Sequence, residues 1–202
     1  MNIILIGYRG TGKSTVGRKL ADTLNIPFYD TDELIQKRTG RVIKEIVEEG
    51  GWGSFREEEK KIIRGLSSVR ESVIATGGGA VMDEENLNVL RKKGVFIWLT
   101  ADVRTIIERM EKDKISDEQR PSLSKDDLYK ETANMLEMRM PVYRQLADFT
   151  VDTSEKDIDV VADEVCLFSS EFKFQSSKFP TQNSEPRTQN SEPRTRNSKL
   201  RR

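Results

Sequence analysis

The chain has 202 residues, a length that suits one domain with a hydrophobic core and is short for two. Its 34 Lys and Arg residues balance 34 Asp and Glu residues, so a net charge of zero gives no overall attraction to nucleic acid. The sequence has no histidine and one cysteine, Cys166, which excludes an intrachain disulfide, a Ser-His-Asp triad and histidine-based zinc sites.

Short apolar runs alternate with helical patterns from the N-terminus to residue 168. The predicted strands cover residues 3–6, 27–30, 72–75, 95–99 and 149–152. The predicted helices cover residues 14–24, 31–38, 42–47, 55–66, 84–93, 103–110, 125–146 and 157–168, with Thr31 and Asp102 as N-caps of two of them. Strands alternating with helices predict an α/β fold with a parallel sheet.

Two segments differ from this pattern. Residues 111–124 are polar and nearly free of apolar anchors, which predicts a mobile loop. From about residue 169 the heptapeptide TQNSEPR occurs at 181–187, again at 188–194, and in altered form at 195–201. Proline and the lack of two apolar positions per repeat argue against a coiled coil, so 169–202 is predicted to be a disordered, dispensable tail. Its eight basic and three acidic residues leave a weak tether to RNA or to an acidic partner as the alternative.

The expected setting of the protein is the cytoplasm. One cysteine suits a reducing compartment. The start of the chain has no basic segment, and its apolar run is too short for a signal peptide or a membrane span. No membrane contact is therefore expected.

A phosphate-binding loop is the strongest signal in the sequence. Residues 7–14 read GYRGTGKS, which fits the pattern G-x-x-x-x-G-K-[ST] between a buried strand and a helix. Glycines let backbone N–H groups converge on phosphate oxygens at the helix N-terminus. Lys13 can reach the β- and γ-phosphates, and the Ser14 hydroxyl can bind Mg²⁺. The residues predicted to bind ATP here are Gly10, Thr11, Gly12, Lys13, Ser14 and Thr15.

Asp30 and Asp32 follow the second predicted strand, at the edge of an open α/β sheet where ligands collect. Either carboxylate could hold Mg²⁺ through water, and the other could accept a hydrogen bond or a proton from a hydroxyl. The alternative is an N-cap followed by a first-turn acid of the next helix.

Three consecutive glycines, 77–79, follow the third predicted strand and would let a ligand approach the backbone, unless they form a plain turn. Arg56 lies three residues before Glu59, so an ion pair within one helix could hold its guanidinium in place. Arg139 precedes Pro141 in a long predicted helix. Each arginine alone would suit a solvated surface, and their occurrence together favours a site.

These motifs resemble the shikimate kinase family. The resemblance runs in order from residue 3 to about 168 and rests on the phosphate loop, Asp30-x-Asp32, Arg56–Glu59 with Gly77–Gly79, Arg120-Pro121 and Arg139-x-Pro141-x-Tyr143. It implies a three-layer P-loop kinase fold with a five-stranded parallel sheet, in a domain spanning residues 1–168. It also implies a lid at about 111–124, an acceptor-binding region at about 31–60, and a tail at 169–202 that is foreign to the family.

The resemblance assigns roles to individual residues. Asp32, Arg56, Arg139 and the backbone at Gly78 and Gly79 would hold shikimate, whose single carboxylate suits arginine forks. Arg120 would be the lid arginine that closes on the phosphates, and Arg109 would stack on adenine. Lys13, Asp32 and Arg120 would carry the transfer of the γ-phosphoryl group to the 3-hydroxyl, with Mg²⁺ held by Ser14 and by Asp30 or Asp32. The expected partners are ATP and shikimate, and the expected state is a monomer.

Two departures and three rival interpretations accompany the resemblance. Residues 50–54 are richer in glycine than is usual in the family, and Ser122 stands where leucine commonly follows Arg-Pro. The nearest rival is a gluconate or nucleoside monophosphate kinase of the same fold. A non-catalytic nucleotide-binding protein would be expected to have lost Lys13, Asp32 or Arg120, and a nucleic-acid binder would act through the basic tail.

Overall fold

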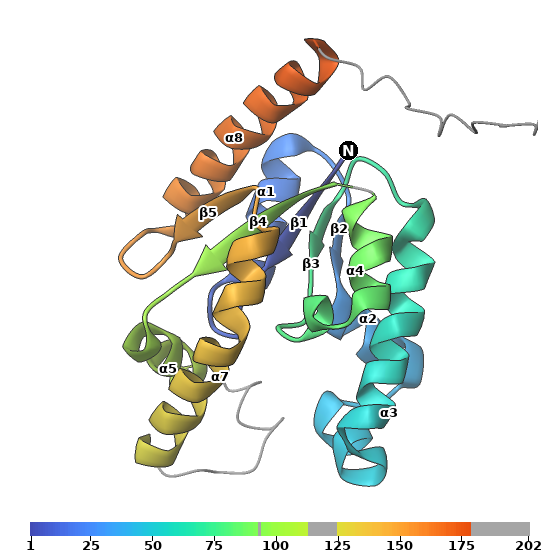
Figure 1. Cartoon of the computed structure of the whole chain (residues 1–202), viewed down its shortest axis with the longest axis vertical. Coiled ribbons are helices and arrows are strands. Elements are labelled where there is room, and N and C mark those ends of the chain that lie inside the picture. Colours follow the sequence, from blue (N-terminus) through green and yellow to red (C-terminus); the bar gives the residue numbers. More distant parts are fainter. Residues whose placement is uncertain (93, 113–124, 179–202) are drawn as a thin grey trace, which may run out of the picture.

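A parallel sheet of five strands forms the centre of the protein, and helices cover both of its faces (Figure 1). The computed structural model describes residues 1–92, 94–112 and 125–178. The strands are β1 (Asn2–Ile6), β2 (Phe28–Asp30), β3 (Val73–Ala75), β4 (Gly94–Thr100) and β5 (Phe149–Asp152), in the order β2-β3-β1-β4-β5. The helices are α1 (Lys13–Leu24), α2 (Thr31–Thr39), α3 (Ile43–Gly65), α4 (Glu84–Arg91), α5 (Val103–Lys112), α7 (Lys125–Leu146) and α8 (Ile158–Lys178), with short 3₁₀ turns at Leu66–Ser68 and Ala80–Met82. The predicted fold class is confirmed.

Alternating side chains of the central strand β1 build two separate core layers. Ile3 and Leu5 point to one face, where they pack with apolar residues of α1 and α8. Ile4 and Ile6 point to the other face, where they pack with apolar residues of α3, α4 and α7. Successive side chains of a strand leave the sheet on opposite sides, so an uninterrupted apolar run marks a strand that is covered on both faces.

The order of the strands places the site. β1 pairs in parallel with β3 on one side and with β4 on the other. The chain therefore leaves β1 toward β2 and later returns to the opposite side of β1, which makes a switch point in the topology. In open α/β sheets ligands bind outside the carboxyl ends of the strands at such a point.

The structure corrects three details of the predicted elements. The N-cap of α2 is Asp30, whose carboxylate accepts hydrogen bonds from the N–H groups of Asp32 and Glu33, whereas Thr31 is the first helical residue. The two helices predicted at 42–47 and 55–66 are present as the two halves of α3 (Ile43–Gly65), and the predicted gap between them is reduced to a break at Gly51. Gly51 has φ 69° and ψ 177°, a conformation essentially restricted to glycine, so the break lies where the glycine-rich segment predicted it.

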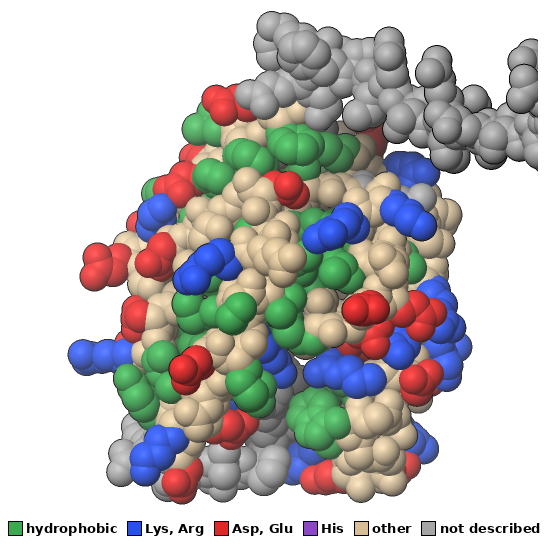
Figure 2. Space-filling view, in the orientation of Figure 1, with side chains coloured by type: hydrophobic (Ala, Val, Ile, Leu, Met, Phe, Trp, Pro, Cys, Tyr) green, Lys and Arg blue, Asp and Glu red, His purple; other side chains and the backbone are tan. Residues whose placement is uncertain are grey.

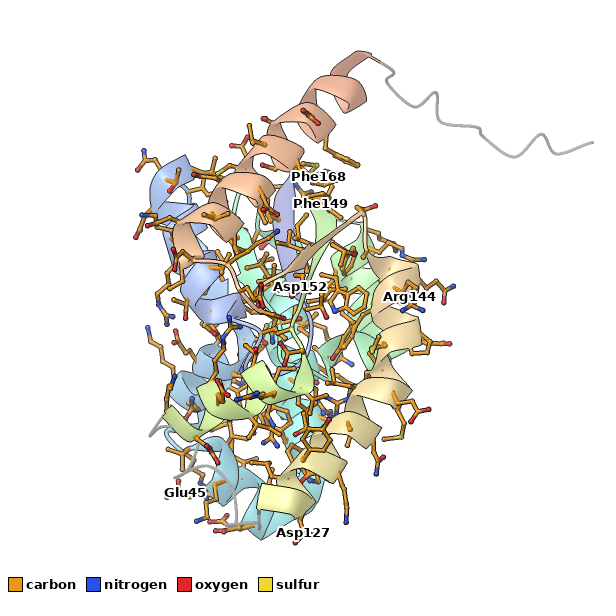
Figure 3. All side chains as sticks on the ribbon, turned by 90° about the vertical axis from the view of Figure 1, so that its left-hand side faces the viewer. Glu45, Asp127, Arg144, Phe149, Asp152 and Phe168 are labelled. Carbon is orange, nitrogen blue, oxygen red and sulfur yellow. The ribbon has the colours of Figure 1, made fainter. Side chains whose placement is uncertain are left out.

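The third correction concerns the C-terminal helix. α8 continues to Lys178, ten residues beyond its predicted end at residue 168. The ring of Phe168 stacks on Phe149 of β5 with centroids 4.5 Å apart (Figure 3). The ring of Phe172 packs against Phe168 in turn. The predicted start of the tail at 169 therefore falls inside a helix that contacts the core. Of the lid predicted at 111–124, Glu111 and Lys112 are the last residues of α5, in place of a loop. Residues 113–124 and the repeats at 181–201 lie outside the described residues. Within the ranges that the structure describes, no helix combines the length and apolar character needed to cross a bilayer.

Candidate active site

A pocket of about 1130 Å³ opens at the carboxyl ends of β1, β2 and β3. Figure 2 shows the surface hollowed between α7 and α3, with basic side chains at its edges. The pocket wall combines the phosphate loop with the residues that follow β2 and β3 and with parts of α3, α5 and α7. Among the residues predicted from the sequence, it contains Gly10, Thr11, Gly12, Lys13, Ser14, Thr15, Asp30, Asp32, Arg56, Gly78, Gly79, Arg109 and Arg139. Arg120 lies outside the described residues.

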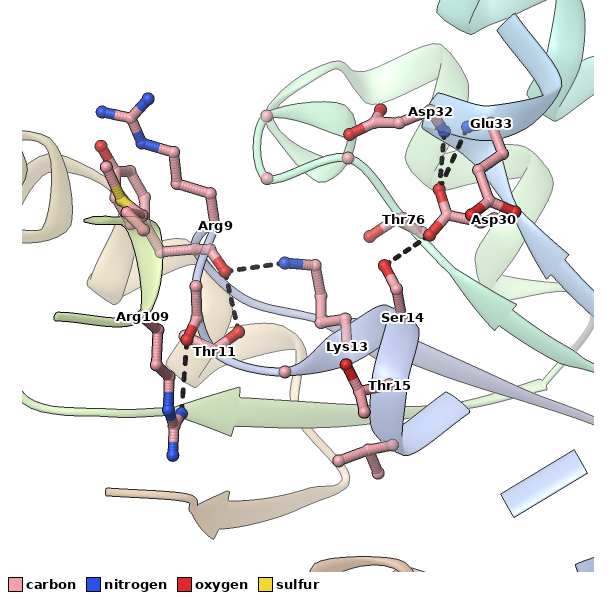
Figure 4. A pocket seen from close by; sticks show the side chains of 18 of the residues that line it. Arg9, Thr11, Lys13, Ser14, Thr15, Asp30, Asp32, Glu33, Thr76 and Arg109 are labelled. Carbon is pink, nitrogen blue, oxygen red and sulfur yellow. Dashed lines mark hydrogen bonds between the residues drawn. The ribbon is translucent and has the colours of Figure 1, made fainter. Parts of the chain in front are cut away.

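The phosphate loop passes from β1 into the N-terminus of α1. Gly12, the N-cap, has φ 85° and ψ 12°, so the turn into the helix uses a left-handed conformation that favours glycine. The Tyr8 carbonyl accepts hydrogen bonds from the Thr11 hydroxyl and from the Lys13 ammonium, each at 2.7 Å. These contacts turn the loop back over the first turn of α1 at the wall of the pocket (Figure 4). The N-terminus of a helix is a favourable place for an anion such as phosphate.

Lys13, the lysine of the phosphate-loop motif, is nearly buried. Burial lowers the pKa of Lys13 to about 8, because desolvation disfavours the ammonium form, while the nearby carboxylates of Asp32 and Asp30 oppose that shift. The ammonium donates to the neutral Tyr8 carbonyl at the wall of the pocket, and an oxygen of a nucleotide phosphate would be a stronger, charged acceptor in its place.

Ser14 and Asp30 form the part of the site that suits Mg²⁺. The Ser14 hydroxyl donates a hydrogen bond to Asp30 Oδ2 at 2.6 Å, while the other oxygen of Asp30 caps α2. A hydroxyl and a carboxylate oxygen are hard donors, and Mg²⁺ is usually held by one or two protein groups together with phosphates and water. Of the two carboxylates predicted for the metal, the structure brings Asp30 to Ser14. The cap interpretation is also correct for Asp30.

Asp32 faces the pocket from the first turn of α2. Its Oδ1 is buried and has no hydrogen-bond partner among the described residues. Burial, followed by the charges of Asp30 and Glu59, raises the pKa of Asp32 to about 7. An unpaired buried carboxylate oxygen is costly, and a ligand hydroxyl that donates to it would remove that cost.

Arg56 and Glu59 form the ion pair that their spacing predicts. Arg56 Nη1 donates to Glu59 Oε2 at 2.6 Å, and Glu59 is fully buried. The rings of Trp52 and Phe55 lie within 5.8 Å and 5.1 Å of the Arg56 guanidinium. A Cβ atom at Gly79 would lie 2.3 Å from Arg56 Nη2, so only glycine lets the guanidinium approach this backbone.

Arg139 comes from α7 on the opposite wall of the pocket. Its guanidinium lies 5.7 Å from the ring centroid of Tyr8. A Cβ atom at Gly78 would lie 3.4 Å from Arg139 Nη1. The buried Tyr143, one turn further along α7, donates its hydroxyl to the Gly78 carbonyl. The two arginines therefore reach the triple-glycine turn from separate helices, which supports a binding function for the turn beyond its role as a connection.

Arg109 lies on the other side of the phosphate loop from the Asp30–Asp32 pair (Figure 4). Its guanidinium donates to the Gly10 carbonyl at 3.3 Å and to both the hydroxyl and the carbonyl of Thr153, at 2.9 Å and 2.5 Å. The pocket thus has two wings, one with Asp32, Arg56 and Arg139 and one with Arg109, joined by the phosphate loop.

Comparison with known proteins identifies the family. The family model described as "Shikimate kinase" matches residues 9–169. A shikimate kinase of Syntrophus aciditrophicus (strain SB) is 48% identical over 172 residues, which cover 81% of this chain and 88% of the relative. The chain belongs to the shikimate kinase family. A shikimate kinase of Caldanaerobacter subterraneus subsp. tengcongensis is 44% identical over 164 residues, covering 81% and 93% of the two chains.

Solved shikimate kinase structures share this architecture. The shikimate kinase of Acinetobacter baumannii, in complex with shikimate, superposes with a TM-score of 0.78 at 33% identity, over 85% of this chain and 94% of that one. The shikimate kinase of Aquifex aeolicus gives a TM-score of 0.70 at 36% identity, over 86% and 99%. The shikimate kinase fold therefore accounts for the described part of the chain.

Two residues of the site were missed or undervalued in the sequence. Thr153 was not singled out, because a threonine after a strand has many possible roles and its partners are more than 40 residues away along the chain. Glu59 was expected only as the partner of Arg56, yet its second oxygen, Oε1, is buried without a hydrogen-bond partner among the described residues. A Cβ atom at Gly77 would lie within 3 Å of both Glu59 Oε1 and Asp32 Oδ1, so Glu59 belongs to the same pocket as Asp32.

Proposed function

We infer that this chain is an ATP-dependent kinase that phosphorylates the 3-hydroxyl of shikimate and yields shikimate 3-phosphate, a step of chorismate and aromatic amino acid biosynthesis. Membership of the shikimate kinase family supports this activity. The observation that carries it in the structure is the meeting of two arginines and an unpaired aspartate with a phosphate loop in one pocket.

The wing of the pocket with Asp32, Arg56 and Arg139, which we call the acceptor wing, fits a small hydroxylated carboxylic acid. Arg56 and Arg139 approach the turn of Gly78 and Gly79 from two helices, and paired guanidinium groups suit a single carboxylate. Asp32 Oδ1 is free to accept a hydrogen bond from a ring hydroxyl. In this arrangement the carboxylate and the reacting hydroxyl of one molecule bind at separate points, which orients the hydroxyl toward the phosphate loop.

On the nucleotide side we propose that the amides of residues 10–15 and the Lys13 ammonium bind the phosphates of ATP. Mg²⁺, held by Ser14 and by Asp30 through water, would neutralise phosphate charge when bound. Lys13 would move from the Tyr8 carbonyl to the phosphates as ATP enters. Arg109 would stack on the adenine ring, and Arg120 would close over the phosphates. Asp32 would orient the attacking hydroxyl, and a raised pKa of about 7 would also let it take the proton as the new P–O bond forms.

We also propose that the chain acts as a monomer in the cytoplasm and does not depend on nucleic acid. The zero net charge and the single cysteine support these expectations. Light scattering on the purified chain tests the first, and steeply salt-dependent RNA binding would contradict the last.

The decisive experiment measures ADP release by the purified chain with ATP and Mg²⁺, offering shikimate, gluconate, CMP or AMP one at a time. We expect turnover with shikimate and background release with the other three. Turnover with gluconate or a nucleotide would replace the acceptor while keeping the phosphate-loop roles. Silence with all four, in a folded chain that binds ATP, would contradict the proposed function.

A further inference from the structure

Thr153 connects three segments at the wing of the pocket that contains Arg109, which we call the nucleotide wing. It follows β5 directly and is 3% exposed. Its N–H donates to the Thr100 carbonyl at the end of β4, at 2.8 Å. Its hydroxyl lies 3.3 Å from the Thr11 carbonyl of the phosphate loop and 2.9 Å from Arg109 Nη1 of α5. One small side chain thus contacts the phosphate loop, α5 and the sheet at the wall of the nucleotide pocket.

The donor and acceptor count at this hydroxyl determines its direction. An arginine can only donate, so the Thr153 oxygen accepts from Arg109 Nη1. The single hydroxyl hydrogen then points to the carbonyl of Thr100 at 3.1 Å or of Thr11 at 3.3 Å. Arg109 Nη2 donates to the carbonyl of the same threonine at 2.5 Å. Thr153 therefore receives both terminal nitrogens of the guanidinium, and this two-point contact fixes the plane of the group.

The neighbouring residue strengthens the connection. The Ser154 hydroxyl accepts a hydrogen bond from the N–H of Asp102, in the turn between β4 and α5, at 3.0 Å. The same hydroxyl donates to Asp152 Oδ1 at 2.6 Å. The Asp102–Ser154 bond thus joins the turn before α5 to the turn after β5, beside the bond from Thr153 N–H to the Thr100 carbonyl, and so helps to fix how α5 carries Arg109 to the phosphate loop.

We propose that Thr153 is a positioning residue for the nucleotide base, which holds the Arg109 guanidinium in the plane on which the base stacks. The inference rests on the proposed function, because it requires that the nucleotide base binds beside Arg109. A planar guanidinium stacks on an aromatic ring only when the two planes lie parallel, so a free Arg109 would have to be ordered each time a nucleotide binds. The alternative is that Thr153 only ties the edge strand β5 to the sheet.

The test measures equilibrium binding by calorimetry on the full chain with Mg²⁺ and no acceptor, using ATP and inorganic tripolyphosphate as ligands. Tripolyphosphate has the phosphates of ATP without the base, so it reports on the phosphate loop alone. The variants are Thr153→Val, which removes the hydroxyl and keeps the shape, Thr153→Ser, which restores the hydroxyl, Arg109→Ala, and the double variant of Thr153→Val with Arg109→Ala. Thr23→Val is the matched control, because it removes one threonine hydroxyl bonded to a carbonyl on the exposed side of α1.

We expect Thr153→Val to weaken ATP binding by about five- to tenfold, the size of one partly compensated hydrogen bond to a charged group. Tripolyphosphate binding should change less than twofold, and Thr153→Ser should bind ATP like the wild type. The double variant should bind ATP no more weakly than Arg109→Ala alone, because Thr153 acts through Arg109. Thr23→Val should match the wild type with both ligands.

Three results would overturn the inference. They are unchanged ATP affinity in a folded Thr153→Val chain, equal losses for ATP and tripolyphosphate, and additive effects of the two substitutions. If Thr153→Val does not fold, Thr153→Cys takes its place with the same expected and contradicting results, since a thiol is a poorer hydrogen-bonding group of similar size. Because no acceptor is present, a failure of shikimate turnover leaves this test intact. A wild-type chain that binds neither ligand would instead contradict the proposed function.

Discussion

At the scale of single residues, the site concentrates the buried charge of the part of the chain that the structure describes. Burial lowers the pKa of Lys13 and raises the pKa of Asp32 and of Glu59, so it favours the uncharged form of each side chain. Oδ1 of Asp32 and Oε1 of Glu59 have no hydrogen-bond partner among the described residues. Such groups cost stability in the free protein, and ligands that pair with them recover that cost on binding.

Arg139→Ala tests the acceptor wing. We expect the KM for shikimate to rise about 10- to 100-fold, since a hydrogen-bonded contact between a guanidinium and a carboxylate is lost. The KM for ATP and the melting temperature should stay close to the wild type. Arg144→Ala is the matched control, because Arg144 lies on the same helix, is exposed and does not line the pocket (Figure 3). Equal shikimate KM values for the two variants would remove Arg139 from the site.

Asp32→Asn should separate stability from activity. The pKa of Asp32 is about 7 in the fold against an ordinary value of 3.8, so the folded chain keeps a proton that the unfolded chain releases. The stabilising effect of that proton is complete below pH 3.8 and is lost as the pH rises through 7. At pH 8 the asparagine variant should therefore be more stable than the wild type, by about 1–3 kcal/mol, while kcat falls sharply.

Urea unfolding at pH 5 and pH 8 checks the prediction for Asp32. The stability gained by Asp32→Asn should be larger at pH 8. Asp22→Asn, which removes a carboxylate at an exposed position on α1, is the matched control. A gain for Asp32→Asn that does not depend on pH would show that the carboxylate is already charged without penalty in the fold.

At the scale of elements, the backbone conformation of α3 affects the geometry of the site. The helix breaks at Gly51 and resumes with Trp52, Phe55 and Arg56, which line the acceptor wing. A Cβ atom at Gly51 would meet nothing within 4 Å, so the requirement for glycine there comes from φ and ψ alone. The break therefore sets the direction in which the second half of α3 presents Arg56.

Gly51→Ala and Gly53→Ala make a matched pair. Gly53 lies in the helical part of α3 with open space around it. We expect Gly51→Ala to lower the free energy of unfolding by about 1–3 kcal/mol and to raise the KM for shikimate. Gly53→Ala should raise it by up to about 1 kcal/mol, because alanine favours a helix over glycine. Urea unfolding and shikimate titrations measure both, and an opposite order of stabilities would contradict the role of the break.

At the scale of the whole molecule, α8 closes one face of the sheet and carries the chain away from it (Figure 1). Ser169 is buried, and Phe172 is half-buried against Phe168 and the core. Exposed apolar side chains of the same helix, such as Leu167, contribute no comparable packing. The stable unit therefore extends past residue 168, although the family model ends at 169.

Truncation distinguishes the two boundaries. Deletion of residues 179–202 should leave kcat and the melting temperature nearly unchanged. Deletion of 169–202 should lower the free energy of unfolding by about 1–3 kcal/mol, because it also removes the apolar area that Phe172 buries. In the full chain, Phe172→Ala should be destabilising and Leu167→Ala nearly neutral. Equal melting temperatures for the two truncations would restore the boundary at 168.

Local signals determined much of this protein from its sequence alone. Apolar runs predicted β1, β3 and β4, because a strand covered on both faces has few polar positions, whereas the edge strands β2 and β5 are short and partly polar. Helical spacing predicted α1, α4, α5 and α7 to within a few residues. The loop at 7–14 predicted a nucleotide site, because the glycines, lysine and serine of this motif generally act on adjacent phosphates. The ion pair between Arg56 and Glu59 could be predicted because the two residues lie one helical turn apart.

Contacts between distant segments were decided only by the tertiary structure. Asp30 rather than Asp32 meets Ser14, because Asp30 ends β2 while Asp32 lies within the first turn of α2 and points into the pocket. Thr153 accepts a hydrogen bond from Arg109, which lies 44 residues earlier in the chain. The helix α8 continues past a change in composition, because Phe172 packs against Phe168. The separation of two residues along the chain does not predict such contacts. They are set by the order of strands in the sheet and by which side chains the folded core brings together.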